Sequence, residues 1–249
     1  MAKQRMAVIA VYSLKGGVGK TSLAVNLAWS SATQSSRRTL LWDLDPQSAA
    51  SFLLGHEGKS RGAAQAVFAK DVAPELLIAP TAIDRLSLLA ADTSLRGLDG
   101  LFFRMDKKKR LAKLIEGLAK TYDRVILDCP PGLTETSEQV MRAADIILVP
   151  VIPSPLSRRA FDEVVAHLDR EHKGHGAILP VFSMVDRRRT LHRKALDADP
   201  AWPVIPMASA VEQMAVRRAP VGTYAVDSAA GEAFTALWRG VEKKLGMRR

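Results

Sequence analysis

Short apolar runs alternate along the chain with longer segments whose apolar residues recur every three or four positions. The first pattern is typical of buried strands and the second of amphipathic helices. Strands are predicted over 7–12, 39–42, 86–89, 123–128, 145–151, 177–185 and 202–205. Helices are predicted over 20–29, 49–54, 63–68, 107–118, 134–144, 157–171 and 190–196, and again at the C-terminus, where Phe234, Leu237, Trp238, Val241 and Leu245 share one face.

This alternation of strands and helices predicts the fold class. Strand followed by helix, repeated along a chain, is typical of an α/β fold with a doubly wound, mostly parallel sheet and helices on both faces. A chain of 249 residues is long enough to bury a sizeable core. No linker-like stretch divides it, so we expect a single domain over 1–249.

A glycine-rich loop joins the first predicted strand to the first predicted helix. It reads Lys15-Gly16-Gly17-Val18-Gly19-Lys20-Thr21-Ser22. Glycines let the backbone turn so tightly that successive N–H groups face an anion, and the helix N-terminus adds further donors. Lys20 would reach the β- and γ-phosphates of a nucleotide, and the Thr21 hydroxyl would ligate Mg²⁺. The loop therefore predicts a nucleotide site of the P-loop type.

The loop departs from the ordinary P-loop pattern at its start. That pattern places a glycine where this chain has Leu14. A second lysine, Lys15, stands instead at the beginning of the loop, at the far end from Lys20. A cation in that place need not serve the same nucleotide as Lys20.

Three aspartates that follow predicted strands extend this site. Asp43 and Asp45 lie two residues apart on an extended segment, so their side chains face the same side. They end a strand beside the phosphate loop, where open α/β sheets bind ligands. We assign the orientation of the attacking water to Asp45, which Pro46 holds extended, and a water-mediated metal contact to Asp43. Asp128 ends an apolar strand in the manner of a carboxylate that holds Mg²⁺ through its water shell.

The basic residues point to phosphate-bearing partners. The chain carries 36 lysines and arginines against 26 aspartates and glutamates, a formal charge of +10 that permits association with nucleic acid or an anionic membrane. Two basic clusters in or beside predicted loops would grip DNA phosphates without reading sequence, and an ordinary solvated surface is the alternative. The clusters comprise Arg187, Arg188, Arg189, Arg193 and Lys194, and Arg217 with Arg218 in a later loop.

Cysteine and histidine add little to the site. One cysteine, Cys129, excludes a disulfide within the chain and fits a reducing compartment. Five scattered histidines offer no metal-ligand spacing, and His172 and His175, in a glycine-rich turn, are expected to be solvated.

The last helix ends in Lys243, Lys244, Arg248 and Arg249. Such a basic amphipathic helix can lie on a membrane, but we expect it to pack on its own sheet.

Several motifs together resemble those of ParA-type partitioning ATPases in the ParA/MinD family. The matches are Lys15–Ser22, Asn26, Asp43-x-Asp45-Pro46-Gln47, Tyr122-Asp123 through Asp128-x-Pro130-Pro131, and Val149-Pro150-Val151. The resemblance implies ATP and Mg²⁺ as cofactors, an ATP-sandwich homodimer, nonspecific DNA binding, and slow hydrolysis stimulated by a ParB-like or cargo-adaptor partner. The implied cargo is a chromosome, plasmid or protein assembly, and the implied location is the cytoplasm, on the nucleoid.

The resemblance also implies individual roles. Lys15 resembles the signature lysine that crosses a dimer interface to the partner's phosphates, and with Lys20 and Asp45 it forms the implied catalytic set. Phosphate contacts are implied for Gly16, Gly17, Val18, Gly19, Lys20, Thr21 and Ser22, adenine contacts for Asp186, Pro206 and Met207, and metal contacts for Thr21, Asp43 and Asp128. Ser13-Leu14 and Gly132-Leu133 depart from the Asn-Gln and Ser-Leu that many relatives carry, and neither departure removes a catalytic group.

Two other functions remain open at this stage. A MinD-like membrane-associated regulator would use the C-terminal helix, although we expect no membrane contact. A metabolic ATP-dependent ligase on the same core would need a small-molecule pocket and would turn over without DNA or a partner. A metal cluster shared across a dimer is not expected, because it would need cysteines beyond Cys129.

Overall fold

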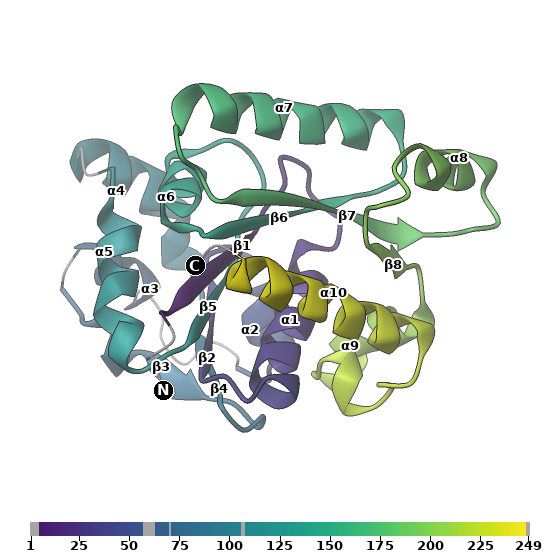
Figure 1. Ribbon diagram of the computed structural model, residues 1–249. Coiled ribbons are helices and arrows are strands. Elements are labelled where there is room, and N and C mark those ends of the chain that lie inside the picture. Colours follow the sequence, from purple (N-terminus) through teal and green to yellow (C-terminus); the bar gives the residue numbers. More distant parts are fainter. Residues whose placement is uncertain (1–4, 57–62, 70, 106–107, 248–249) are drawn as a thin grey trace.

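Eight strands form one sheet in the computed structural model of the chain, which describes residues 5–56, 63–69, 71–105 and 108–247 (Figure 1). The strands lie in the order β3-β4-β2-β5-β1-β6-β7-β8. All neighbours pair in parallel except β3, which runs antiparallel to β4 at the edge. The predicted doubly wound, mostly parallel α/β sheet is confirmed. The strands are β1 Ala7–Val11, β2 Thr39–Asp43, β3 Ile78–Pro80, β4 Leu86–Leu89, β5 Arg124–Asp128, β6 Ile146–Val151, β7 Ala177–Val185 and β8 Val204–Pro206.

Helices cover both faces of this sheet because the central strands are apolar on both sides. In β1, Ala7, Ile9 and Val11 pack with α1, α2, α9 and α10, whereas Val8 and Ala10 pack with α3 to α7 on the opposite face. The α-helices are α1 Lys20–Gln34, α2 Ala49–Leu53, α3 Ala63–Ala69, α4 Leu98–Met105, α5 Arg110–Gly117, α6 Glu135–Ala143, α7 Pro155–Glu171, α8 Thr190–Ala198, α9 Ser209–Arg217 and α10 Ala229–Gly246. Short 3₁₀ turns occupy Pro74–Leu76, Thr93–Gly97, Leu118–Lys120 and Val221–Thr223.

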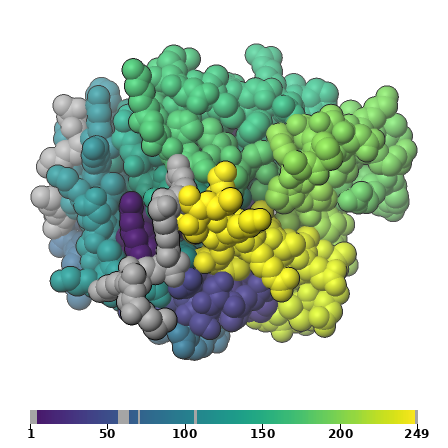
Figure 2. Space-filling model, in the orientation of Figure 1, coloured from purple at the N-terminus to yellow at the C-terminus, as the bar shows by residue number. Residues whose placement is uncertain are grey.

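The C-terminal helix, α10, packs on the protein itself. Its apolar face, including Phe234, Leu237 and Trp238, is buried against the α1 side of the sheet. At its far end Glu242 pairs with the buried guanidinium of Arg124, with N–O distances of 2.7 and 3.0 Å. Figure 2 shows this helix (yellow) beside α1 (purple) on one face of the molecule. The expectation that the helix packs on its own sheet is confirmed.

Several details differ from the sequence-based expectations. Helices α4 and α9 and the edge strand β3 were not predicted, because α4 contains Gly100 and adjacent apolar residues and α9 buries only Met214. Arg217 is therefore the last residue of a helix rather than part of a loop, and the last strand begins at Val204 instead of 202. Lys107, Arg248 and Arg249, expected at helix ends, lie outside the described residues.

One histidine was also misjudged. His172 is only 5% exposed, so the expectation that it is solvated is wrong. Its residue caps the C-terminal end of α7, and the ring turns back against Glu138 of α6 instead of facing water. Cys129 is fully buried directly after β5.

Candidate nucleotide site

The loop between β1 and α1 needs glycine at two positions. Gly17 and Gly19 have φ angles of 70° and 88°, in the left-handed region that side chains disfavour. A Cβ at Gly19 would also lie 2.9 Å from the Ser183 hydroxyl oxygen. Gly19 caps α1 without any side-chain hydrogen bond, so the first amides of the helix are left to bind an anion.

A cavity of about 510 Å³ opens above this loop. It combines the loop with the segment that follows β2, the 3₁₀ turn that follows β4 and the turn that follows β5, so residues from four distant parts of the sequence meet there. The size and the amide-rich wall suit a polyphosphate. The lining residues are Gly16, Gly17, Gly19, Lys20, Thr21, Ser22, Asp45, Pro46, Gln47, Arg96, Pro130 and Pro131.

The two lysines of the loop have different surroundings. The Lys20 side chain is buried, and its ammonium donates to the backbone carbonyl of Lys15 at 3.2 Å. Burial lowers the pKa of Lys20, and the charges of Asp128 and Asp45 partly oppose that shift. Lys15 is half-exposed and does not line the phosphate cavity. Within the described chain, its ammonium has no ion-pair or hydrogen-bond partner.

The Asp43 carboxylate accepts hydrogen bonds from the segment that follows β2. One carboxylate oxygen accepts from the Ser51 amide at 2.9 Å and the Ser51 hydroxyl at 2.7 Å, and the other accepts from the Asp45 amide at 3.1 Å. The residue is fully buried, which raises its pKa to about 6 despite these bonds. Asp43 therefore fixes the path of residues 43–51 and so the position of Asp45, which lines the phosphate cavity.

The surroundings of the Asp128 carboxylate differ from those of Asp43. It is fully buried, and neither carboxylate oxygen has a hydrogen-bond partner among the described residues. Burial and then the neighbouring charge of Asp43 raise the pKa of Asp128, while Thr21 and Lys20 lie close enough to oppose that shift. A buried carboxylate without partners is costly unless a cation or ordered water satisfies it. Asp128 and Thr21 thus offer the oxygen donors that suit Mg²⁺.

The turn after β5 is tied to the end of β1. The Tyr12 hydroxyl donates to the Gly132 carbonyl at 2.9 Å, and Gly132 itself has a φ of 90°. Thr134 then caps α6 in a capping box with Ser137. The turn that carries Pro130 and Pro131 into the phosphate cavity is therefore held at its C-terminal end.

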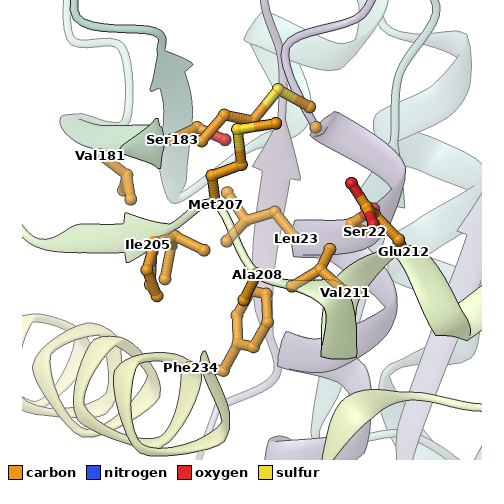
Figure 3. Close-up of a pocket in the computed structure, with 13 residues that line it drawn as sticks. Ser22, Leu23, Val181, Ser183, Ile205, Met207, Ala208, Val211, Glu212 and Phe234 are labelled. Atoms are coloured by element: carbon orange, nitrogen blue, oxygen red, sulfur yellow. The ribbon is translucent and has the colours of Figure 1, made fainter. Parts of the chain in front are cut away.

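A second, mostly apolar cavity adjoins the phosphate loop (Figure 3). Pro206 and Met207, expected as adenine contacts, line it together with Leu23, Val181 and Ile205. Asp186 does not line it. Its carboxylate binds the Arg188 guanidinium at 2.9 and 3.0 Å, which lowers the pKa of Asp186 to about 2, and its amide donates to His192 Nδ1.

The basic clusters occupy two separate elements. Arg187, Arg188 and Arg189 form the turn before α8, and Arg193 braces that turn by donating to the carbonyls of Arg187 and Arg188, both at 3.0 Å. The exposed charges of Arg187 and Lys194 have no ion-pair partner among the described residues. At the end of α9, Arg217 lies 4.8 Å from the Tyr224 ring centroid and Arg218 lies 4.7 Å from that of Phe52.

Sequence reasoning missed two members of the site. Arg96, in the 3₁₀ turn after β4, lines the phosphate cavity, and Ser51 holds Asp43. Asn26, noted only as a motif match, is buried at the junction of α1 and α9. Its amide donates to the Ser22 carbonyl and the Met214 sulfur and accepts from the Val221 amide at 2.8 Å. No local pattern marks Arg96 or Ser51, because each reaches the site through long-range packing.

The glycine loop on β1, the helix behind it and the carboxylate ending β5 define a P-loop nucleotide-binding protein. The family model AAA_31, described as an AAA domain, matches residues 6–175. The chain is 27% identical over 250 residues to the chromosome partitioning protein ParA of Myxococcus xanthus, covering 95% of this chain and 88% of the relative. It is 28% identical over 259 residues to ParA of Caulobacter vibrioides, covering 97% and 96%. The chain belongs to the ParA/MinD family of P-loop ATPases.

Solved structures share this fold. A Cyanothece McdA variant in complex with ATP superposes with a TM-score of 0.81 at 22% identity, covering 98% of each chain. Cobyrinic acid a,c-diamide synthase from Mycobacterium smegmatis, with a bound ATP analogue and magnesium, also gives 0.81, at 24% identity and 98% and 97% coverage. These likenesses establish the architecture, which McdA and the cobyrinic acid a,c-diamide synthase have in common.

Proposed function

We propose that the protein is a ParA-like ATPase that positions a cargo on DNA, acting as one domain over 1–249. ATP with Mg²⁺ binds in the phosphate cavity, and two copies close around two nucleotides. The dimer binds duplex DNA without sequence preference, in the cytoplasm and on the nucleoid. A ParB-like or cargo-adaptor protein accelerates a hydrolysis that is otherwise slow. The cargo is a chromosome, a plasmid or a protein assembly.

The glycine loop, Thr21 and the three aspartates have separate roles in this scheme. The amides of residues 16–22 and the Lys20 ammonium bind the phosphates, and Thr21 and Asp128 hold the metal, with Asp43 behind them. Mg²⁺ bound there would neutralise phosphate charge during transfer. Asp45 orients the attacking water. Turnover is slow because the site is preorganised for phosphate while water positioning awaits the partner.

The observation that carries the dimer is the position of Lys15. Lys15 is half-exposed and does not line the phosphate cavity of its own chain, and its ammonium lacks a partner among the described residues. A loop lysine that does not face its own nucleotide is available to the nucleotide of a second copy. This supports an ATP-sandwich dimer completed by Lys15 from each side.

We assign the DNA contacts from the exposure and the partners of each basic residue. Arg187, Arg189 and Lys194 are exposed, and of these Arg189 also lies 3.5 Å from the Asp186 carboxylate. Arg188 and Arg193 are exposed as well, but they hold the turn through Asp186 and backbone carbonyls. We expect the first three to contact phosphates and the other two to position them. Arg217 and Arg218 rest on aromatic rings and would extend the contact from α9.

The test is binding to an unrelated DNA duplex with ATP, with ADP and without nucleotide, across a salt series. We expect binding only with ATP, with a steep loss as salt rises. Replacing Arg187, Arg189 and Lys194 by alanine should weaken binding at least about tenfold. Replacing Arg239, Lys243 and Lys244, which are equally exposed on α10, removes the same charge and should have little effect. Absence of ATP-dependent binding at low salt would reject the DNA-carrier function.

The two alternatives would then be tested next. A MinD-like membrane function is less well supported, because the apolar face of α10 is buried against the sheet. Among the described helices, none is long and apolar enough to cross a bilayer. A metabolic ligase would hydrolyse ATP only with its small substrate and would ignore both DNA and a partner protein.

A further inference from the structure

A cluster of one half-buried carboxylate and two imidazoles lies between α6 and α7, outside the nucleotide site. Glu138 comes from α6, His167 from the last turns of α7, and His172 from the residue that caps α7. Nε2 of His167 is 2.6 Å from one carboxylate oxygen, and Nε2 of His172 is 2.8 Å from the other. One ligand atom from each of the three residues lies within 4.8 Å of the others.

We propose that Glu138, His167 and His172 bind a divalent transition-metal ion of the Zn²⁺ class. Two imidazole nitrogens and one carboxylate oxygen are a donor set that zinc uses in proteins. Zinc-to-ligand bonds of about 2.0–2.2 Å place tetrahedral ligand atoms about 3.3 Å apart. The observed contacts of 2.6 and 2.8 Å would open by about 0.5–0.7 Å to admit the ion, which side-chain rotation can supply.

The imidazole rings of His167 and His172 are oriented by their contacts with the Glu138 carboxylate. His167 and His172 have side-chain exposures of only 11% and 3%. The buried Nδ1 of His167 has no hydrogen-bond partner in the described chain, so the contact with Glu138 is what orients that ring.

One cation competes for the same carboxylate. A terminal nitrogen of the Arg142 guanidinium lies 3.2 Å from Glu138, on the oxygen that His172 also contacts. Arg142 is 28% exposed and follows Glu138 by one helical turn, so its side chain can swing into solvent. A bound ion would replace the guanidinium as the counter-charge of Glu138. Removing Arg142 should therefore tighten metal binding.

An ion bound at this cluster would act on a helix that begins beside the phosphate cavity. Helix α6 begins directly after the turn that carries Pro130 and Pro131 into the phosphate cavity. Glu138 also lines a separate cavity of about 330 Å³ together with Leu133 and Thr134. A metal at Glu138 would tie α6 to α7, with a fourth ligand supplied from that cavity by water or by a partner's side chain.

The experiment is a Co²⁺ titration of the metal-stripped full chain without a histidine tag, followed by displacement with Zn²⁺. We expect one ion per chain and the visible absorption bands of tetrahedral Co²⁺ with nitrogen ligands. Glu138→Gln and His167→Gln should each weaken Co²⁺ binding at least tenfold, while Arg142→Gln should strengthen it several-fold. His175→Gln is the matched control, because that nearby histidine binds Asp169 and the Gly176 carbonyl instead of Glu138.

Three outcomes would overturn the proposal. They are the absence of tetrahedral bands in the unaltered protein, undiminished binding in Glu138→Gln, and an equal loss in His175→Gln. Circular dichroism of each variant separates ligand loss from misfolding, and the unaltered protein alone suffices to reject the site. Nucleotide plays no part in the titration, so the result is independent of the proposed ATPase function.

Discussion

Asp43 and Asp128 are register partners at the carboxyl ends of the neighbouring parallel strands β2 and β5, and both are fully buried. Their chemical situations are nevertheless opposite. Asp43 accepts three hydrogen bonds from Ser51 and Asp45, whereas Asp128 accepts none within the described chain. One aspartate therefore organises the loop, and the other is left for a ligand.

This contrast predicts different effects of alanine at the two positions. Asp43→Ala leaves three donors without an acceptor and should lower the free energy of unfolding by about 2–3 kcal/mol. Asp128→Ala removes a buried charge without orphaning a donor, so stability should change by less than about 1 kcal/mol or rise. ATP hydrolysis by Asp128→Ala should fall at least about 100-fold. Urea unfolding and phosphate release measure both effects, and a strongly destabilised Asp128→Ala would contradict this assignment.

Substitutions of Lys15 and of Asp45 should impair different steps, dimerisation in the first case and hydrolysis in the second. Lys15→Gln should impair the ATP-bound dimer, because the proposed dimer uses its ammonium at the nucleotide of the second copy. Asp45→Ala should still dimerise with ATP and persist as a dimer, because hydrolysis is slowed while the phosphate contacts remain. Light scattering coupled to gel filtration, in ATP and in ADP, distinguishes the two. A monomeric Asp45→Ala protein in ATP would count against the role given to Asp45.

Arg96 should contribute to nucleotide affinity although it belongs to none of the loop motifs. It is exposed and lines the phosphate cavity, so it adds a second cation beside Lys20. Arg96→Ala should weaken ATP binding about three- to tenfold, as expected for a solvent-screened charged contact. Titration with a fluorescent ATP analogue measures the change. Arg104→Ala, an exposed arginine of α4 outside the cavity, is the control and should bind normally.

A pH-dependent contribution to stability is expected from Asp123. Its carboxylate accepts from the backbone amide and the guanidinium of Arg38, which lowers its pKa below 3.8 and joins the starts of β2 and β5. A carboxyl group whose pKa is lower in the folded than in the unfolded state stabilises the protein at pH values above the unfolded-state pKa. That stabilisation is lost as the pH falls through the folded-state pKa. Asp123→Asn should cost about 1 kcal/mol at pH 7, and this cost should shrink as pH falls below the unfolded pKa and then through the lower folded pKa. A pH-independent difference in urea unfolding would show that the charge is not responsible.

The fold could be predicted from the sequence because its signals are local. Apolar runs and amphipathic periods depend only on neighbouring residues, and they identified β1, β2, α1 and α7 without any contact being known. Where periodicity was weak the prediction failed, as in α4 with its internal glycine and in α9, which buries only Met214. The glycine loop is equally local, since the turn and the phosphate-binding amides belong to eight consecutive residues.

By itself, the sequence determined the α/β class, the phosphate loop from Lys15 to Ser22 and the aspartates that follow β2 and β5, because each is a contiguous pattern. Tertiary structure alone decided which of Asp43 and Asp128 is left without partners, because that depends on Ser51 and on the strand register. It also brought Arg96 to the phosphates and joined Glu138 to His167 and His172 across 29 and 34 residues. Such contacts follow from how the helices pack on the sheet, and no spacing along the chain encodes them.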